Sequence, residues 1–296
     1  MLPQASFTEL VALLAPLATQ DGFLPTAMPE IQVVSARGNV ARSPQIYEPS
    51  LMVIAQGSKL AYLEDRTLEY GAGHYLVQAL PVPFEYETFA SVHAPLLGVV
   101  IAIDRALLSE LVMAMGESSD GPASPQTPAS MVSVELDAPM LEAVLRLLKC
   151  LHDPTERAAM GQARLKDVLF AALRGPQGGV LRALVEQRGQ FARLATALTY
   201  LHNHFAEPLN VEQLARCANM STSVFHAHFK RSITVAPGQY LKRLRLIKAQ
   251  QYLQTRDTTV AQVALEVGYQ STSQFSREYK RYFGFPPVQE RAQRPA

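Results

Sequence analysis

The sequence predicts an α+β protein in which an antiparallel β-barrel with flanking helices precedes an all-α part. Three observations predict this division of the 296 residues. Short β-rich runs lie between turn formers from Ile31 to Ile103, a helical pattern occurs twice between Asn210 and Pro287, and the net charge changes sign. Residues 1–189 carry 13 Lys and Arg against 20 Asp and Glu, whereas residues 190–296 carry 14 against 6. We therefore expect two domains, 1–189 and 190–296, and a polyanion as the partner of the second.

The first hundred residues define the core of the expected N-terminal domain. Residues 1–17 have no basic start and carry Glu9 among apolar side chains, which indicates an amphipathic helix rather than a signal peptide. The strand-like runs that follow are separated by Gly and Pro at intervals of roughly 8–12 residues, which is typical of an antiparallel sandwich or barrel. These runs are residues 31–38, 51–57, 59–65, 73–80, 84–90 and 96–103.

Helical spacing follows the strand-like runs. Residues 104–115 and 164–173 have it, and Ala138–Leu151 places apolar side chains at i, i+3, i+4, i+7 and i+10. This apolar stripe either packs on the barrel and on other helices or forms a dimer interface. Gly116–Ser130 is small, polar and Pro-rich and is expected to be a mobile loop, and the Gly-rich segment 175–179 ends the helical pattern.

Composition excludes several classes of protein. The apolar fraction of 48 % supports a packed core, and no run of about 18 apolar residues predicts a membrane helix. Only Cys150 and Cys217 are present, which argues against a disulfide framework and for a cytoplasmic protein. Cys150 is expected to be an apolar filler, with a redox or electrophile sensor as the alternative.

The basic part contains an internal duplication. Residues 210–215 align with residues 259–264 at an offset of 49, and residues 221–225 align with residues 271–275 at an offset of 50. Each copy is typical of a helix-turn-helix. Asn210 and Thr259 are suitable N-caps with Gln three residues later, as in a capping box, and Asn or Gly stands in the turn. Ser221 and Ser271 are expected to cap the second helices.

The second helix of each copy divides into an apolar and a polar face. Phe225 and Phe229, and Phe275 and Tyr279, are expected to face the core. The opposite stripes are small, polar and basic, which suits insertion into the major groove of double-stranded DNA, where Arg277 can read guanine. The candidate DNA-binding residues are Ser221, Thr222, Ser223, His226, Ala227, Lys230, Ser271, Thr272, Ser273, Ser276, Arg277, Lys280 and Arg281.

A single helix is expected between the two copies. Residues 240–254 contain neither Gly nor Pro, and Lys242 and Arg243 on this connector are further DNA-binding candidates that contribute general electrostatics. A rigid connector fixes the distance between the two recognition helices, so one chain could read two adjacent major grooves, about 34 Å apart.

Residues 209–291 resemble the DNA-binding domain of the AraC/XylS transcription regulators. The resemblance lies in Leu214-Ala215, Lys242–Leu246, Val267–Ser271, Ser273–Lys280 and Phe283–Pro287. One departure is Thr234, where the family usually has Gly, and it makes the end of the first recognition helix uncertain. The resemblance implies a transcription regulator, more often an activator, with RNA polymerase as a partner.

The front part resembles the cupin-like N-terminal domain of one AraC subgroup through residues 46–51, 56–59 and 70–76. This resemblance implies a small-barrel effector or regulatory module. A small organic effector and a homodimer are further expectations. The alternative is a barrel filled by its own side chains. His74 and Tyr75, as neighbours on a strand, are not both expected to point inward. The candidate ligand-binding residues are Tyr62, His74, Tyr75, Phe84 and Tyr86.

The rival functions are a metal-dependent cupin enzyme and an RNA-binding module. The β-rich region has His74 and His93 but no His-x-His pair, so we expect no metal, no cofactor and no catalysis. The pairs His202/His204 and His226/His228 are on expected helices, where residues i and i+2 point to different faces. A duplicated helix-turn-helix without an aromatic stacking platform argues against RNA.

Overall fold

The computed structural model describes residues 4–116, 128–186 and 189–292. The chain divides into two compact units. The first comprises Met1–Arg42 and Tyr47–Ala192, and the second comprises Arg193–Ala296 with the short segment Ser43–Ile46. Residues 117–127, which make up most of the expected mobile loop, lie outside the described residues.

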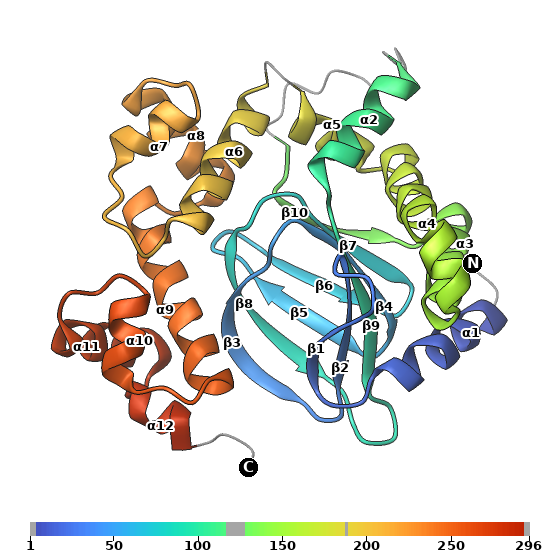
Figure 1. The fold of residues 1–296 in the computed structure, drawn as a ribbon, viewed down its shortest axis with the longest axis horizontal. Helices are drawn as coiled ribbons and strands as arrows, with labels where there is room; N and C mark the ends of the chain where they lie inside the picture. The colour runs from blue at the N-terminus through green and yellow to red at the C-terminus, as the bar shows by residue number, and fades with distance from the viewer. Residues whose placement is uncertain (1–3, 117–127, 187–188, 293–296) are drawn as a thin grey trace. The chain divides into compact units, whose positions relative to one another are not determined.

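Two antiparallel sheets form the centre of the first unit (Figure 1). The larger has the order β1-β2-β9-β4-β7-β10 and the smaller the order β3-β8-β5-β6. The predicted strand-like runs correspond to β2, β4, β5, β7, β8 and β9, whereas β1, β3, β6 and β10 were not predicted. The strands are β1 (Gly22–Pro25), β2 (Ile31–Ala36), β3 (Val40–Ile46), β4 (Ser50–Gln56), β5 (Ser58–Tyr62), β6 (Thr67–Gly71), β7 (His74–Gln78), β8 (Pro83–Phe89), β9 (Leu96–Ala102) and β10 (Met131–Glu135).

The predicted barrel is not closed, because the strands form two separate sheets. Gly57 alone separates β4 of the larger sheet from β5 of the smaller one. Its φ of 79° favours glycine, and a Cβ at this position would lie 2.9 Å from Leu96 Cα. The corner at Gly57 therefore turns the chain from one sheet to the other instead of continuing one ladder around a barrel.

The helices of the first unit lie beside its sheets, with α1, α3 and α4 together on one side (Figure 1). The predicted stripe of α3, including Leu141, Val144 and Leu148, is buried within this unit. The structure thus favours packing over a dimer interface for this stripe. The 175–179 segment separates two helices as predicted, but the second begins at Gly178. The helices are α1 (Gln4–Leu14), the 3-10 turn η1 (Ala15–Leu17), α2 (Arg105–Met115), α3 (Ala138–His152), α4 (Pro154–Arg174) and α5 (Gly178–Val185).

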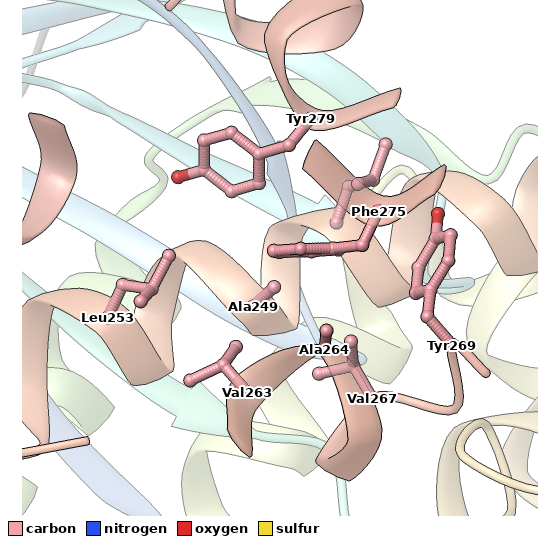
Figure 2. Close-up of a cluster of buried hydrophobic side chains, with 9 residues drawn as sticks. Ala249, Leu253, Val263, Ala264, Val267, Tyr269, Phe275 and Tyr279 are labelled. Atoms are coloured by element: carbon pink, nitrogen blue, oxygen red, sulfur yellow. The ribbon is translucent and has the colours of Figure 1, made fainter. Parts of the chain in front are cut away.

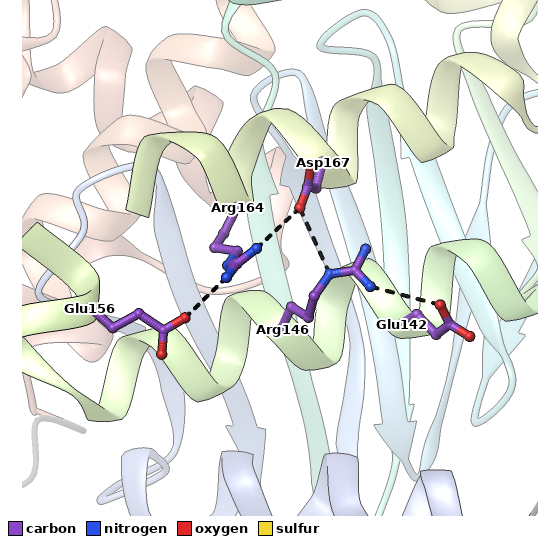
Figure 3. Close-up of polar contacts among 5 residues, drawn as sticks. All are labelled: Glu142, Arg146, Glu156, Arg164 and Asp167. Atoms are coloured by element: carbon purple, nitrogen blue, oxygen red, sulfur yellow. Dashed lines mark hydrogen bonds and ion pairs between the residues drawn. The ribbon is translucent and has the colours of Figure 1, made fainter. Parts of the chain in front are cut away.

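A chain of ion pairs connects the outer faces of α3 and α4 (Figure 3). Arg146 lies 3.7 Å from Glu142 and 3.7 Å from Asp167, and Arg164 lies 3.6 Å from Asp167 and 3.3 Å from Glu156. Most of these side chains are partly exposed, so each pair contributes at most about 1 kcal/mol to stability. The buried leucines of α3 contribute more to holding the two helices together.

From Gln190 onward, all described elements of the second unit are helices. Its connector helix α9 separates two short helical pairs, α7 with α8 and α10 with α11, as the sequence predicts. Figure 2 shows the core of the second pair, in which Ala249 and Leu253 of α9 contact Val263, Ala264, Phe275 and Tyr279. The helices are α6 (Gln190–Asn203), α7 (Val211–Cys217), α8 (Thr222–Ile233), α9 (Pro237–Thr255), α10 (Val260–Glu266), α11 (Thr272–Phe283) and α12 (Pro287–Ala292).

Within the part of the chain that the structure describes, no helix combines the length and the apolar character needed to cross a membrane.

Candidate nucleic-acid interface

The two copies found in the sequence form equivalent hydrogen bonds in the structure. Asn210 caps α7 and Thr259 caps α10, and each forms the predicted capping box with the Gln three residues later. In the first turn the Met220 amide donates to the Ala215 carbonyl at 2.9 Å, and in the second the Tyr269 amide donates to Ala264 at 2.8 Å. These bonds are 49 residues apart in the chain, and they give both turns the same backbone path.

Each of the two turns contains one residue in the left-handed backbone conformation. Asn219 has a φ of 50° and Gly268 a φ of 88°, as expected for the positions where the sequence places Asn and Gly. A Cβ at Gly268 would also lie 2.4 Å from the Ala206 carbonyl oxygen, so the second turn requires glycine for space as well as conformation. Gln270 is the extra residue that changes the offset from 49 to 50.

Both recognition helices end in the same way. Thr234 has a φ of 69° and its amide donates to the Lys230 carbonyl, while Gly284 has a φ of 85° and its amide donates to Lys280. Thr234 therefore adopts the left-handed conformation that glycine adopts in the second copy. The uncertainty that the sequence raised about the end of α8 is resolved, since α8 and α11 have equal lengths of 12 residues.

The predicted faces of α8 and α11 are present. Phe225 and Phe229, and Phe275 and Tyr279, are fully buried. The polar candidates lie on the outside, and Ser221 and Ser271 cap the two helices as expected. Ser276 is only half-exposed. The exposed candidates are Ser221, Thr222, Ser223, His226, Ala227, Lys230, Ser271, Thr272, Ser273, Arg277, Lys280 and Arg281.

Two exposed residues near the start of these helices were not among the predicted contacts. Val224 and Gln274 occupy equivalent positions and are both exposed, Val224 to 41 %. A valine can contact a thymine methyl group, and a glutamine can bond to adenine with two hydrogen bonds. The mismatch at this position between two otherwise matched copies is the sequence signal that could have identified them.

Lys242 on the connector is paired within the unit. Its Nζ lies 3.0 Å from Glu278 Oε1 on α11, and its side chain is 29 % exposed. Besides its predicted role as a general electrostatic contact with DNA, Lys242 therefore also positions α11. Arg243 is half-buried. Arg245 donates to the carbonyls of Phe205 and Glu207 at 2.7 and 2.8 Å and so attaches α9 to the segment before α7.

Glu278 is the centre of the network that holds α11. The Tyr269 hydroxyl donates to Glu278 Oε2 at 2.9 Å, and Gln274 Nε2 donates to Oε1 at 3.4 Å. Burial raises the pKa of Glu278, but the bonds from Lys242, Tyr269 and Gln274 outweigh it and hold the pKa below the usual value. Glu278 is therefore ionised at neutral pH and accepts from groups on α9, the turn and its own helix.

The His-x-His pairs of the second unit do not converge on a metal. His202 Nε2 lies 2.5 Å from the Tyr240 hydroxyl, and His204 Nδ1 lies 2.8 Å from Glu207. Among the residues that the structure describes, no group of three His, Cys, Asp or Glu side chains could hold a metal ion.

The candidate ligand-binding residues of the first unit separate into four places. Phe84 and Tyr86 line the space between the two sheets, since Phe84 packs on Tyr47 with ring centroids 4.9 Å apart and Tyr86 lies under Lys59. Tyr62 is on the other face of β5, where it donates to Glu87 and lies 4.0 Å below the Arg42 guanidinium.

His74 and Tyr75 point in opposite directions, as strand alternation requires. His74 is exposed, and Tyr75 is buried with its hydroxyl beside Gly175. The five predicted residues therefore do not form one site.

A buried polar cluster between the sheets was missed by the sequence analysis. Lys59 is 2 % exposed, and its Nζ donates to the Tyr47 hydroxyl at 2.9 Å. The same Nζ lies 4.4 Å from the Tyr86 ring centroid and 5.7 Å from that of Phe23, which belongs to the opposite sheet. Tyr70 is directly across from Lys59 in the register of β5 and β6.

The ionisation of this cluster follows from its burial. Burial lowers the pKa of Lys59 from 10.5 to about 7. Burial likewise raises the pKa of Tyr47, Tyr70 and Tyr86, so these phenols remain protonated. Lys59 is thus the member of the cluster that titrates near neutrality.

Cys150 fits the role of an apolar filler. Its side chain is buried in α3, and burial is the main reason that the pKa of its thiol is raised. Both properties oppose the thiolate that a redox sensor needs.

Two matched helix-turn-helix units on one connector, with exposed polar and basic faces, define the class of helix-turn-helix DNA-binding regulators. Comparison with known proteins identifies the family. The model of the AraC-type transcriptional regulator N-terminus matches residues 27–180, more than half of the chain, and a helix-turn-helix domain model matches residues 214–293. The chain therefore belongs to the AraC-type transcriptional regulators, which confirms the resemblance found in the sequence.

Individual relatives support this assignment over part of their length. The HTH-type transcriptional activator RhaS of Escherichia fergusonii is 34 % identical over 105 residues, which are 36 % of this chain and 38 % of that protein. The HTH-type transcriptional regulator GbdR of Pseudomonas aeruginosa is 32 % identical over 103 residues, 35 % of this chain and 28 % of GbdR. The matches thus span 28–38 % of these relatives.

The fold extends over the whole chain. The crystal structure of an apo ToxT variant from Vibrio cholerae matches with a TM-score of 0.59 and covers 92 % of this chain and 100 % of ToxT. The identity is 9 %, so this likeness concerns the fold alone. It supports the predicted order of an antiparallel β unit before a helical unit.

Proposed function

We propose that the protein is a sequence-specific regulator that binds double-stranded DNA through α8 and α11 and changes its DNA affinity when the first unit binds a small organic effector. The observation that carries the proposal is the matched exposure of two polar and basic helix faces in a segment with 14 basic and 6 acidic residues. Two such faces in one unit are what reading two successive major grooves requires.

The connector supports the two-groove arrangement. Helix α9 has 19 residues and contacts the cores of both helical pairs. A helix of this length spans about 28 Å, which is close to the 34–36 Å between successive major grooves on one side of DNA. The equivalent capping and turn hydrogen bonds of the two pairs support the same placement of α8 and α11 relative to their own first helices.

Residues on the two recognition helices differ in their proposed roles. Arg277 reads a base edge, because it is exposed in the middle of α11 and its guanidinium can form two bonds with guanine. Lys230, Lys280 and Arg281, in the last turns of their helices, contact phosphates. Ser223 and His226 are the base-reading candidates on α8, and Val224 and Gln274 join them on the basis of their exposure.

The first unit supplies the regulation. We propose that it holds the effector site, dimerises and contacts RNA polymerase, and the similarity to the activator RhaS supports activation as the mode of regulation. Activation of transcription in the cytoplasm is the form of regulation that we propose. The metal-dependent enzyme considered from the sequence has no supporting observation.

DNA binding by the full chain tests the proposal. Selection of bound sequences from a random duplex library, followed by fluorescence anisotropy on the selected duplex, is expected to yield a preferred site and an affinity that falls steeply with salt. The double variant Lys230→Ala/Lys280→Ala should bind more weakly with a shallower salt dependence. Lys149→Ala/Lys166→Ala, which removes the same charge from the first unit, should bind like the unaltered protein. Equal loss in both double variants, or no sequence preference after selection, contradicts the proposal.

A further inference from the structure

The space between the two sheets contains a cation without a matching anion. Lys59 is 2 % exposed and forms one hydrogen bond, from its Nζ to the Tyr47 hydroxyl. An ammonium group has three donors, so two remain without an acceptor. Among the described residues no carboxylate pairs with Lys59, and burial alone accounts for the lowering of its pKa.

Tyr70 presents a second unmatched group at the same place. It is 1 % exposed and faces Lys59 across the β5–β6 ladder, and its hydroxyl, which lies near the Tyr47 hydroxyl, forms no hydrogen bond of full geometry in the described structure. A buried hydroxyl without a partner costs about 1–3 kcal/mol, and a buried unpaired ammonium costs more. A single anionic acceptor with two oxygens can accept a hydrogen bond from each of these two groups.

We propose that Lys59 and Tyr70 bind the carboxylate of a small organic acid, which is the effector of this regulator. One carboxylate oxygen accepts from Lys59 Nζ and the other from the Tyr70 hydroxyl, while Tyr47 keeps its bond to Lys59. This proposal rests on the proposed function, since it names the chemical class of the effector.

The surroundings select a monoanion with an apolar body. Phe23, Phe84 and Tyr86 provide aromatic surface around Lys59. One monoanion neutralises one ammonium, whereas a phosphate dianion would leave a net buried charge. A neutral alcohol or amide leaves the ammonium without a counterion. The site therefore distinguishes an acid from its own amide.

The proton balance of binding is set by the same residues. Tyr47, Tyr70 and Tyr86 face Lys59 and remain protonated at neutral pH because burial raises their pKa values. A carboxylate requires the ammonium form of Lys59, whose pKa in the free protein is about 7. Above pH 7 each bound acid therefore brings one proton with it, and affinity falls up to tenfold per pH unit.

Thermal unfolding of the full chain with three pairs of probes tests the site. The probes are acetate and acetamide, benzoate and benzamide, and octanoate and octanamide. We expect at least one carboxylate to raise the melting temperature of the first unit in a saturable way while its amide does not, with a weaker effect at pH 8.5 than at pH 7. NMR of the labelled lysine Nζ should show the Lys59 pKa rising on binding.

Three variants identify the residues responsible. Lys59→Met should abolish the response to carboxylates, and Tyr70→Phe should weaken it about 3- to 10-fold, the equivalent of one hydrogen bond. Tyr70→Phe removes a single unpaired atom, so it remains informative if Lys59→Met folds poorly. Lys149→Met removes an exposed lysine of the same unit and should respond like the unaltered protein.

Several outcomes overturn the inference. They are equal shifts with acids and amides, no shift with any of the three acids, or an undiminished response in both Lys59→Met and Tyr70→Phe. Anisotropy with the selected DNA separates these failures from a failure of the proposed function. If the chain binds its DNA but ignores carboxylates, the effector class is wrong and the regulator stands. If carboxylates bind but the chain binds no DNA, the proposed function is wrong.

Discussion

Thr234 shows how a single residue can hold an unfavourable backbone conformation. A left-handed conformation costs a residue with a β-branched side chain about 1–2 kcal/mol, and Thr234 adopts it with a φ of 69°. The surrounding structure enforces it, because Ile233 and Val235 on either side are both buried. The equivalent Gly284 adopts the same conformation without this cost.

Thr234→Gly should therefore raise the free energy of unfolding of the helical unit by about 0.5–1 kcal/mol, since relief of strain exceeds the added freedom of the unfolded chain. The reciprocal change Gly284→Thr should lower it by about 1–2 kcal/mol. Differential scanning calorimetry of the full chain measures both. A destabilising Thr234→Gly would mean that the threonine side chain, which bonds to the Ile233 carbonyl, is worth more than the strain.

Lys59 makes stability depend on pH in a defined window. Its pKa is about 7 in the folded protein against 10.5 as its ordinary value, so between these values the unfolded chain holds a proton that the folded chain lacks. Stability from this group therefore rises as pH increases from 7 to about 10.5. Lys59→Met should remove this rise and stabilise the first unit by roughly 1–3 kcal/mol at pH 7. Chemical denaturation at pH 7 and pH 9 checks it, and the same pH slope in both proteins would contradict it.

At the scale of elements, α11 is positioned from three directions. Its N-cap Ser271 fixes its start, Gly284 fixes its end, and Glu278 accepts from Lys242 of α9 and Tyr269 of the turn. Helix α8 has the same caps, but Phe229 packs against Tyr240 of α9 instead of an ion pair crossing to it. We infer that α11 is the more sensitive of the two to charge and salt.

Arg277 and Lys280 lie one turn apart on the exposed face of α11 and have different predicted effects on DNA binding. Arg277→Ala should cost about 1–3 kcal/mol on the preferred site and relax the preference at one base pair. Lys280→Ala should weaken all sequences alike and reduce the salt slope by about 1. Selection from a random library with each variant distinguishes them. An unchanged base preference in Arg277→Ala would remove Arg277 from the base-reading residues.

Gly268 determines whether the second turn can form. Gly268→Ala would bring a Cβ within 2.4 Å of the Ala206 carbonyl oxygen at a φ of 88°, and should destabilise the helical unit by about 2 kcal/mol or more. Gly238→Ala is the matched control, because Gly238 is in α9 with no atom within 4 Å of its added Cβ. It should leave stability unchanged or raise it by up to about 1 kcal/mol. Thermal unfolding that shows equal effects of the two changes would contradict the role of Gly268.

At the scale of the whole molecule, the helical unit could be predicted from the sequence and the interior of the β unit could not. Caps, turns and helix faces depend on residues close together in the chain, so two copies of the pattern were enough to place them. The spatial relation of Lys59 to Tyr47 and Phe23 depends on strands from two sheets. The sequence did not indicate which residues of β5 face inward, and the structure buries Lys59 and Ala61 and leaves Leu60 and Tyr62 half-exposed.

The two-sheet arrangement could not be predicted either, because several of its strands carry no clear strand pattern in the sequence. Strands β1, β3 and β10 are short or irregular in sequence, and β3 contains Pro44, which indicated a turn. Strands β3 and β10 pair with β8 and β7, which are far along the chain, whereas β1 pairs with the next strand, β2. The domain boundary at residues 189/190 and the individual DNA contacts remain predictions, which the experiments above address.

The unbroken connector α9 has a consequence for the DNA. A helix without Gly or Pro in its interior resists twisting and bending, so the two recognition helices keep one angular phase. One base pair inserted between two half-sites moves them about 3.4 Å apart and rotates one about 34–36° around the DNA axis relative to the other. The protein has no joint in α9 that could follow this screw motion. An operator lengthened by one base pair should therefore engage only one recognition helix, and full affinity should return only when the original spacing does.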